Sequence, residues 1–161
     1  MLPLVQQVAH HRGTSPNKPG EFHQCYHEHH VAGFKAVGSG WYQSGQELRE
    51  VRAPYIGLLP AGELDRNGIV GPYDMYWVKF DWKAVLPQAG EMTVGVELHG
   101  QTVRRSHSRP LSGEEERRVI ALFHDLLAVA RRPDLPSRWR AGARVVELIA
   151  MWAEPPAAEG G

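Results

Sequence analysis

The sequence predicts a mainly β domain followed by two C-terminal α-helices. Three observations support this. Short β-prone runs separated by glycine turns fill residues 21–110, a capping box begins at Ser112, and Pro133 and Pro136 divide the helical remainder into two parts. Turn signals this frequent between short strands favour a sandwich or barrel over alternating strand–helix units.

The length, net charge and cysteine count of the chain limit the classes of protein to which it can belong. A chain of 161 residues fits one domain and can bury a core without covalent staples. The formal net charge is +0, so no global field attracts the chain to DNA or to anionic membranes. Cys25 is the only cysteine, which excludes an intramolecular disulfide. With no signal peptide and no apolar run of ~18 residues, we expect a cytoplasmic protein without a membrane partner.

Four segments are expected along the chain. Residues 1–20 form an N-terminal arm, because the turn-rich run from Thr14 to Gly20 lacks apolar periodicity, and we expect a flexible or partner-dependent conformation there. The β domain follows at residues 21–110 and a helical segment at residues 111–154. Residues 155–161 have the composition of a linker.

The β domain is expected to consist of short strands. They are predicted at residues 30–37, 41–43, 48–51, 55–59, 75–82 and 92–98. Glycine-containing turns, Gly38-Ser39-Gly40 and Ser44-Gly45-Gln46, separate the first three of these runs. No amphipathic helix of adequate length interrupts them, so this zone is expected to be all-β.

The helical segment is expected to contain two helices. In the first, Ser112 and Glu115 form a capping box. Its apolar stripe consists of Val119, Leu122, Phe123, Leu126, Leu127 and Ala130. The second helix covers roughly residues 137–153 and has two apolar stripes. These consist of Trp139, Ala143, Val146 and Ile149, and of Ala141, Val145, Leu148 and Trp152.

A helix that is apolar on both sides must be covered on both sides. The β domain and the first helix can cover one stripe of the second helix. The other is covered either by a partner subunit or by the same chain. In the first case the protein is a homodimer with Val145, Leu148 and Trp152 at its interface.

Three segments, in their order and spacing, resemble the N-terminal half of AraC-type transcriptional regulators. They are Gly38-Ser39-Gly40, the run IGLLPAG at residues 56–62 and the run YWVKF at residues 76–80. The resemblance covers residues 30–82 and extends to the helices by pattern only. It implies a cupin-like jelly-roll barrel that binds a small-molecule effector and dimerises, so that the chain is a sensor and not an enzyme. It also implies that DNA binding belongs to a helix-turn-helix domain outside these 161 residues.

The strand at residues 75–82 carries the expected ligand site. Period two places alternate residues of this strand on opposite faces. One face carries Met75, Trp77 and Lys79, and the other carries Tyr76, Val78, Phe80 and Trp82. By resemblance, Trp77 and Met75 are expected to form walls of the effector pocket. His23 and Asn67 are further candidates, placed by counting from the matched turns. The alternative is that Trp77 packs in the core.

A histidine-rich run, FHQCYHEHH at residues 22–30, has a second possible role. His27-Glu28-His29 matches the H-x-H pattern of metal-binding cupins, and Asp65, where many cupins have histidine, could be a third ligand. Such a set suits zinc, iron or nickel and would make the protein a small metal-dependent cupin enzyme. The competing interpretation is a polar strand at the rim of the barrel. Because regulators of the resembled family usually bind organic effectors without metal, we expect no cofactor.

Overall fold

The computed structural model describes residues 1–44, 47–87 and 93–155, so all but the first residue of the predicted linker at residues 155–161 lies outside this range. The predicted class is confirmed, since the chain is mainly β with two C-terminal helices. The strands are β1 (Leu4–Ser15), β2 (His23–Tyr26), β3 (His30–Ser44), β4 (Glu47–Arg52), β5 (Tyr55–Leu59), β6 (Leu64–Asp81), β7 (Thr93–Leu98), β8 (Gln101–Ser106) and β9 (Ser108–Pro110). The helices are α1 (Gly113–Val129) and α2 (Leu135–Ala153).

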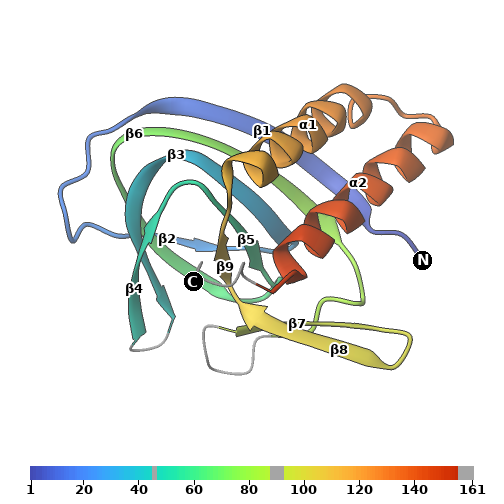
Figure 1. The fold of residues 1–161 in the computed structure, drawn as a ribbon, viewed down its shortest axis with the longest axis horizontal. Helices are drawn as coiled ribbons and strands as arrows, with labels where there is room; N and C mark the ends of the chain where they lie inside the picture. The colour runs from blue at the N-terminus through green and yellow to red at the C-terminus, as the bar shows by residue number, and fades with distance from the viewer. Residues whose placement is uncertain (45–46, 88–92, 156–161) are drawn as a thin grey trace.

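One large antiparallel sheet dominates the molecule. Its strand order is β1-β6-β3-β5-β9, with β2 paired to β6 and β4 paired to β3, while β7 and β8 form a separate hairpin. The long strands β1, β6 and β3 lie side by side and curve together (Figure 1). The closed barrel expected from the sequence is not seen. Within the described residues the end strands β1 and β9 do not pair, so the sheet is curled but open.

The curl is concentrated in the middle of β3 and β6. The register between these strands shifts between Lys35 and Val37 and again between Val37 and Ser39, which is where bulges bend and twist a sheet. Gly38 has a φ of 123° and Gly71 a φ of 74°, values that favour glycine. Each long strand therefore runs through both halves of the bent sheet, one on each side of the bend, which we call the arms of the sheet. The pocket described below lies between these arms.

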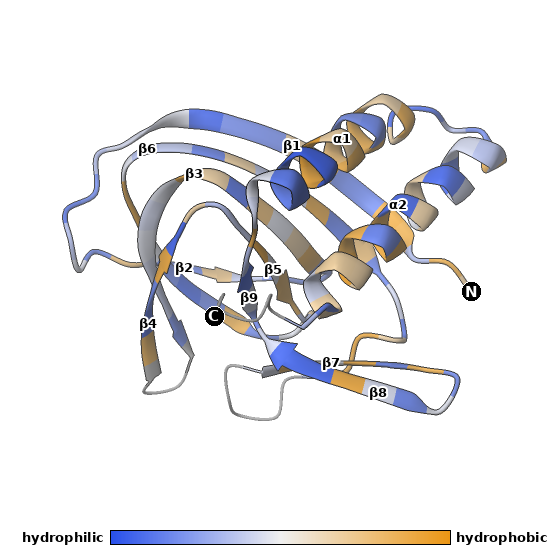
Figure 2. Cartoon of the chain, viewed as in Figure 1, coloured by the Kyte–Doolittle hydropathy of each residue, from blue (hydrophilic) through white to orange (hydrophobic). Residues whose placement is uncertain are grey.

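The two faces of the sheet have different neighbours. Even-numbered residues of β3, β5 and β6 pack with both helices in one hydrophobic core. Its sheet side consists of Ala32, Phe34, Ile56, Leu58, Tyr76, Val78 and Phe80, and its helix side includes Val119, Phe123, Leu126, Val145, Leu148 and Trp152. Hydrophobic and hydrophilic residues alternate along both helices, as expected for helices that bury one face (Figure 2). The alternation predicted for residues 75–82 is confirmed.

The helix boundaries follow the predicted signals. The Ser112 side chain accepts from the Glu115 backbone, whose side chain accepts from the Ser112 backbone in return, so the capping box is confirmed. Asp134 caps α2, and Pro136 occupies its first turn. Neither helix in the described part of the chain is long and apolar enough to cross a membrane.

The predicted dimer interface on α2 is wrong in its residues. Val145, Leu148 and Trp152 have exposed fractions of 0%, 0% and 1%, because this stripe packs against the sheet and α1 within the same chain. No partner subunit can reach them. On the other stripe of α2, Ile149 is also buried, whereas Trp139 is 57% exposed.

The N-terminal segment also differs from expectation. Residues 1–20 were expected to lack regular structure, but Leu4–Ser15 form β1 and pair with Gly71–Asp81 of β6. Its apolar alternation is hidden in the sequence because the register shifts between Val5 and Gln7. Only residues beyond Ser15 keep the expected turn character.

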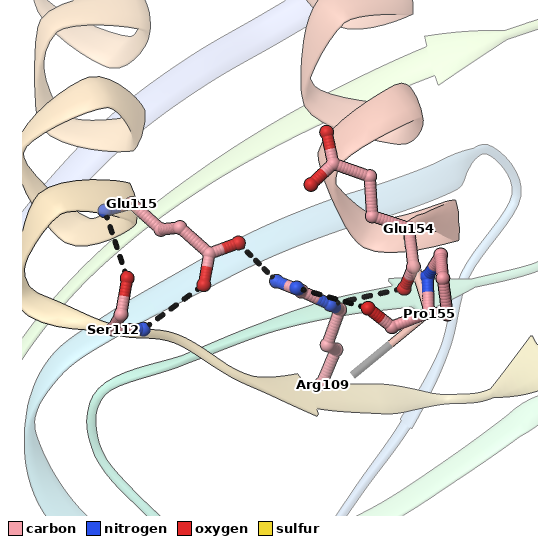
Figure 3. Close-up of polar contacts among 5 residues, drawn as sticks. All are labelled: Arg109, Ser112, Glu115, Glu154 and Pro155. Atoms are coloured by element: carbon pink, nitrogen blue, oxygen red, sulfur yellow. Dashed lines mark hydrogen bonds and ion pairs between the residues drawn. The ribbon is translucent and has the colours of Figure 1, made fainter. Parts of the chain in front are cut away.

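A buried ion pair joins β9 to both helices (Figure 3). Nη1 of Arg109 lies 2.6 Å from Oε2 of Glu115 at the start of α1. The same guanidinium donates from Nε to the carbonyl of Glu154 at 3.1 Å and from Nη2 to the carbonyl of Pro155 at 3.5 Å. Arg109 thus caps the C-terminal end of α2, where unpaired carbonyls and the helix dipole favour a cation.

Candidate ligand pocket

The arms of the curled sheet enclose a pocket of about 450 Å³, within the range of small-molecule sites. All four residues expected to contact a ligand line it, namely Trp77, Met75, Asn67 and His23. Trp77 and Met75 reach it through the face of β6 that points away from the helices. His23 and Asn67 are directly paired across β2 and β6.

The pocket walls are mainly aromatic and aliphatic. Trp41, Tyr42 and Tyr55 join Trp77 around the space. Such rings offer stacking area with polar edges, which suits a planar guest. Tyr42 stacks on His107, with ring centroids 4.1 Å apart and planes 5° from parallel. Burial lowers the pKa of His107 to about 4, so this ring is neutral at physiological pH.

Lys35 is the charged group that sequence reasoning missed. It lies on the pocket face of β3, is only 6% exposed and lines the pocket. Its ammonium group lies 5.5 Å from the centre of the Tyr55 ring. Among the described residues, no carboxylate forms an ion pair with it. Burial therefore lowers the pKa of Lys35 to about 8, although the charge of Asp65 opposes the shift.

Asp65 is the only carboxylate among the described residues that lines the pocket, and it too is only 6% exposed. Its Oδ2 lies 3.1 Å from Nε2 of His27 and accepts from Nδ2 of Asn67 at 3.0 Å. Its Oδ1 is buried and has no hydrogen-bond partner among the described residues. Burial raises the pKa values of Tyr42 and Tyr55, and the Asp65 charge raises both further. Both phenols therefore stay neutral.

The three candidate metal ligands of the alternative interpretation, His27, His29 and Asp65, are not brought together. His27 and Asp65 do meet, but Nδ1 of His29 lies 2.7 Å from Oδ1 of Asp81 and belongs to a different cluster. His27 and His29 would lie on the same face of a regular strand. Their side chains diverge because residues 27–29 lie between β2 and β3, outside either strand. Within the described residues no group of three or more His, Cys, Asp or Glu side chains is placed to hold a metal ion.

One of the missed residues, Lys35, could have been indicated by a signal in the sequence. Lys35 is the only charged residue between Val31 and Gln43, a run that otherwise reads as a buried strand. A lone charge in such a run is costly unless it has a function. Nothing local indicated His107, which enters the pocket only because β9 pairs with β5 beside Gly57.

No protein-family model matches this chain, and no curated protein matches it.

Proposed function

We propose that the chain is the ligand-sensing and dimerisation domain of an AraC-type transcriptional regulator, with the curled sheet as its cupin-like container. In this proposal it controls DNA binding by a helix-turn-helix domain outside these 161 residues. One observation carries the proposal. Trp77, Met75, Asn67 and His23, the positions selected by the resemblance, line a single pocket of ligand-binding size.

The pocket wall is connected to the end of α2, which supports a sensing role. The indole Nε1 of Trp152 donates to the carbonyl of Ser106 at 3.0 Å and to that of His107 at 3.2 Å. Two residues further on, Arg109 bonds the carbonyls of Glu154 and Pro155. A ligand that displaces His107 would thus act on the C-terminal end of α2. Coupling between such sites typically amounts to about 1–3 kcal/mol.

A second connection runs through β1. Tyr76 lines the pocket, and its hydroxyl lies 3.3 Å from Nε2 of His124 on α1. His10 of β1 stacks on the other side of the Tyr76 ring. In the proposed function, β1 is therefore a lever that is already docked on the sheet, rather than an arm that orders only when ligand binds.

Dimerisation is proposed through the outer face of α2. Trp139 is 57% exposed there, and Leu135, one turn earlier, is exposed to the same extent at 57%. Val146 continues this face and is half-buried. Sedimentation equilibrium should give a dimer that Trp139→Glu converts to a monomer. A monomeric wild-type chain at high micromolar concentration contradicts the dimer.

The sensing role can be tested by filling the pocket. A Cβ on Gly33 would meet only the Tyr76 carbonyl, at an ordinary 3.7 Å, so Gly33→Leu places its side chain in the pocket without backbone strain. Gly113→Leu is the matched control, since a Cβ there meets nothing within 4 Å. Sugars, aromatic acids and metal ions are screened by thermal shift. A ligand at ~100 times its dissociation constant adds about 2.7 kcal/mol.

Stabilisation of the wild type and of Gly113→Leu, but not of Gly33→Leu, supports the proposal. Equal stabilisation of all three proteins places the ligand outside the pocket and contradicts it. The 161 residues alone should not shift operator DNA in a gel. Tight, sequence-specific binding by this chain would overturn the assignment of DNA binding to another segment.

A further inference from the structure

The polar groups of the pocket indicate what kind of molecule it takes. Two of these groups, a cation and a hydrogen-bond acceptor, have no matching anion or donor within the described residues. The Lys35 ammonium group has no carboxylate within ion-pair distance, and Oδ1 of Asp65 has no donor. A buried charge or acceptor without a partner costs free energy unless a bound molecule supplies the missing group.

Lys35 and Asp65 both line the pocket, and no ion pair joins them within the described residues. They lie in different arms of the sheet, since Lys35 pairs with Met75 whereas Asp65 pairs with Cys25. The Asp65 charge nevertheless raises the pKa of Lys35, so the two groups are within electrostatic range. The Lys35 ammonium group and Oδ1 of Asp65 are therefore both available to a bound molecule.

The charge balance favours an anion. Among the described residues that line the pocket, two are lysines, Lys35 and Lys79, and one is a carboxylate, Asp65. Oδ2 of Asp65 already lies 3.1 Å from Nε2 of His27 and accepts from Nδ2 of Asn67. The Lys79 ammonium group lies 5.1 Å from the centre of the Trp77 ring, and Lys79 also lines a neighbouring surface hollow. It is therefore placed at the rim, where it can attract an approaching anion.

The walls favour a planar ring over a sugar. Trp41, Tyr42, Tyr55 and Trp77 present aromatic surface, and Val31, Leu59, Ile69 and Met75 present aliphatic surface. A sugar would place several hydroxyl groups against these walls, and each would lose its hydrogen bonds to water. An aromatic ring loses nothing there and gains stacking contacts.

We infer that the pocket takes an aromatic carboxylate that carries a hydroxyl or amino group, with its carboxylate paired to Lys35 and its donor directed at Asp65. This inference rests on the proposed sensing function, because it names the class of effector for the same pocket. A charge-assisted hydrogen bond to a carboxylate is about twice as strong as a neutral one. Lys35 is therefore the main anchor, and Asp65 selects among substituted acids.

The test is a titration of the full chain, followed by tryptophan fluorescence, because Trp41 and Trp77 line the pocket. The probes are benzoate, 3-hydroxybenzoate, 4-hydroxybenzoate, benzyl alcohol, benzylamine and D-glucose. One of the hydroxybenzoates should bind most tightly, and benzoate should bind more tightly than benzyl alcohol. Lys35→Met should weaken binding of the acids at least ~10-fold and leave benzyl alcohol unchanged. Lys83→Met, which removes an exposed lysine, is the matched control.

Two further measurements depend on the same groups. Asp65→Asn should reduce the preference for the hydroxybenzoate over benzoate. In the wild type, benzoate affinity should fall about tenfold between pH 7 and pH 9, as Lys35 loses its proton, while benzyl alcohol affinity stays constant. This second measurement needs no variant, so misfolding of a mutant cannot obscure it.

Preferential binding of benzyl alcohol, benzylamine or D-glucose overturns the assigned ligand class but leaves the sensing role intact, since a pocket ligand has then been found. Acid binding that survives Lys35→Met or does not change with pH also overturns it. If no probe binds at millimolar concentration, the inferred class is wrong. The pocket-filling experiment with Gly33→Leu then decides separately whether the pocket senses another ligand.

Discussion

The imidazole of His10 lies flat against the ring of Tyr76, with centroids 3.9 Å apart and planes 4° from parallel. Nε2 of the same imidazole lies 2.6 Å from Oδ1 of Asp74, and Arg12 also bonds that carboxylate. A strand expected to be a loose arm is therefore held to the pocket wall by a stack and by a polar cluster.

Replacing His10 should show the strength of this attachment. His10→Ala removes the stack on Tyr76 and one bond to Asp74, and we expect a loss of about 1–2 kcal/mol in the free energy of unfolding. Gln7→Ala, an exposed position on the same strand, should change it by less than about 0.5 kcal/mol. Urea denaturation measures both. Equal effects of the two substitutions would show that β1 is held by backbone pairing alone.

Lys35 should reduce the free energy of unfolding, because its ammonium group is buried in the pocket. Because burial lowers its pKa in the folded state to about 8, the unfolded chain binds more protons between pH 8 and pH 10.5. The stability of the wild type should therefore rise as the pH increases through this window. Lys35→Met should remove this rise and stabilise the protein by about 1–3 kcal/mol at pH 7. A destabilised Lys35→Met at pH 7 would indicate that the ammonium group has a partner in the folded protein.

His107 should make the fold sensitive to mild acid. Its pKa is about 4 when folded, compared with 6.5 as the ordinary value, so stability is complete above pH 6.5 and is lost as the pH falls toward 4. The loss between pH 7.5 and pH 5 should be about 2 kcal/mol from this residue. His107→Phe keeps the stack on Tyr42 and should remove this part of the pH dependence. Identical pH profiles for wild type and variant would exclude a neutral, buried His107.

The Arg109 cluster should be important for stability. Arg109→Met leaves Glu115 and the last carbonyls of α2 without their buried partner, at a cost of about 3–5 kcal/mol. The exposed pair of Arg52 and Glu50 provides the control, since Arg52→Met should cost less than about 1 kcal/mol. Thermal or urea unfolding distinguishes the two outcomes. A cost below that of the control would mean that the end of α2 does not depend on Arg109.

What could be predicted from the sequence was mainly local. The capping box of Ser112 and Glu115 needs only four residues, and the alternation through Met75 and Trp77 needs only one strand. Both are confirmed because the local preference agrees with the tertiary structure. His23 and Asn67, which were placed through a family resemblance, both line the pocket, and their pairing across β2 and β6 is not a local property.

What could not be predicted depends on contacts between distant residues. The bend at Gly38 and Gly71 decides which residues of β3 and β6 share the pocket, so Lys35 and Asp65 could not be brought together from their spacing. The same limit explains the error on α2. Its two apolar stripes are almost equivalent in the sequence, and only the packed structure shows that Trp152 faces the core while Trp139 faces outward.

The most direct test of the account is a two-dimensional NMR spectrum of the tryptophan indole groups, recorded as the tightest-binding probe is added. The chain has 5 tryptophans, of which Trp41 and Trp77 line the pocket and Trp139 lies on the outer face of α2. We expect the indole signals of Trp41 and Trp77 to shift until the pocket is saturated with the probe, while the signal of Trp139 stays in place. Shifts at Trp139 without shifts at Trp41 and Trp77 would contradict it.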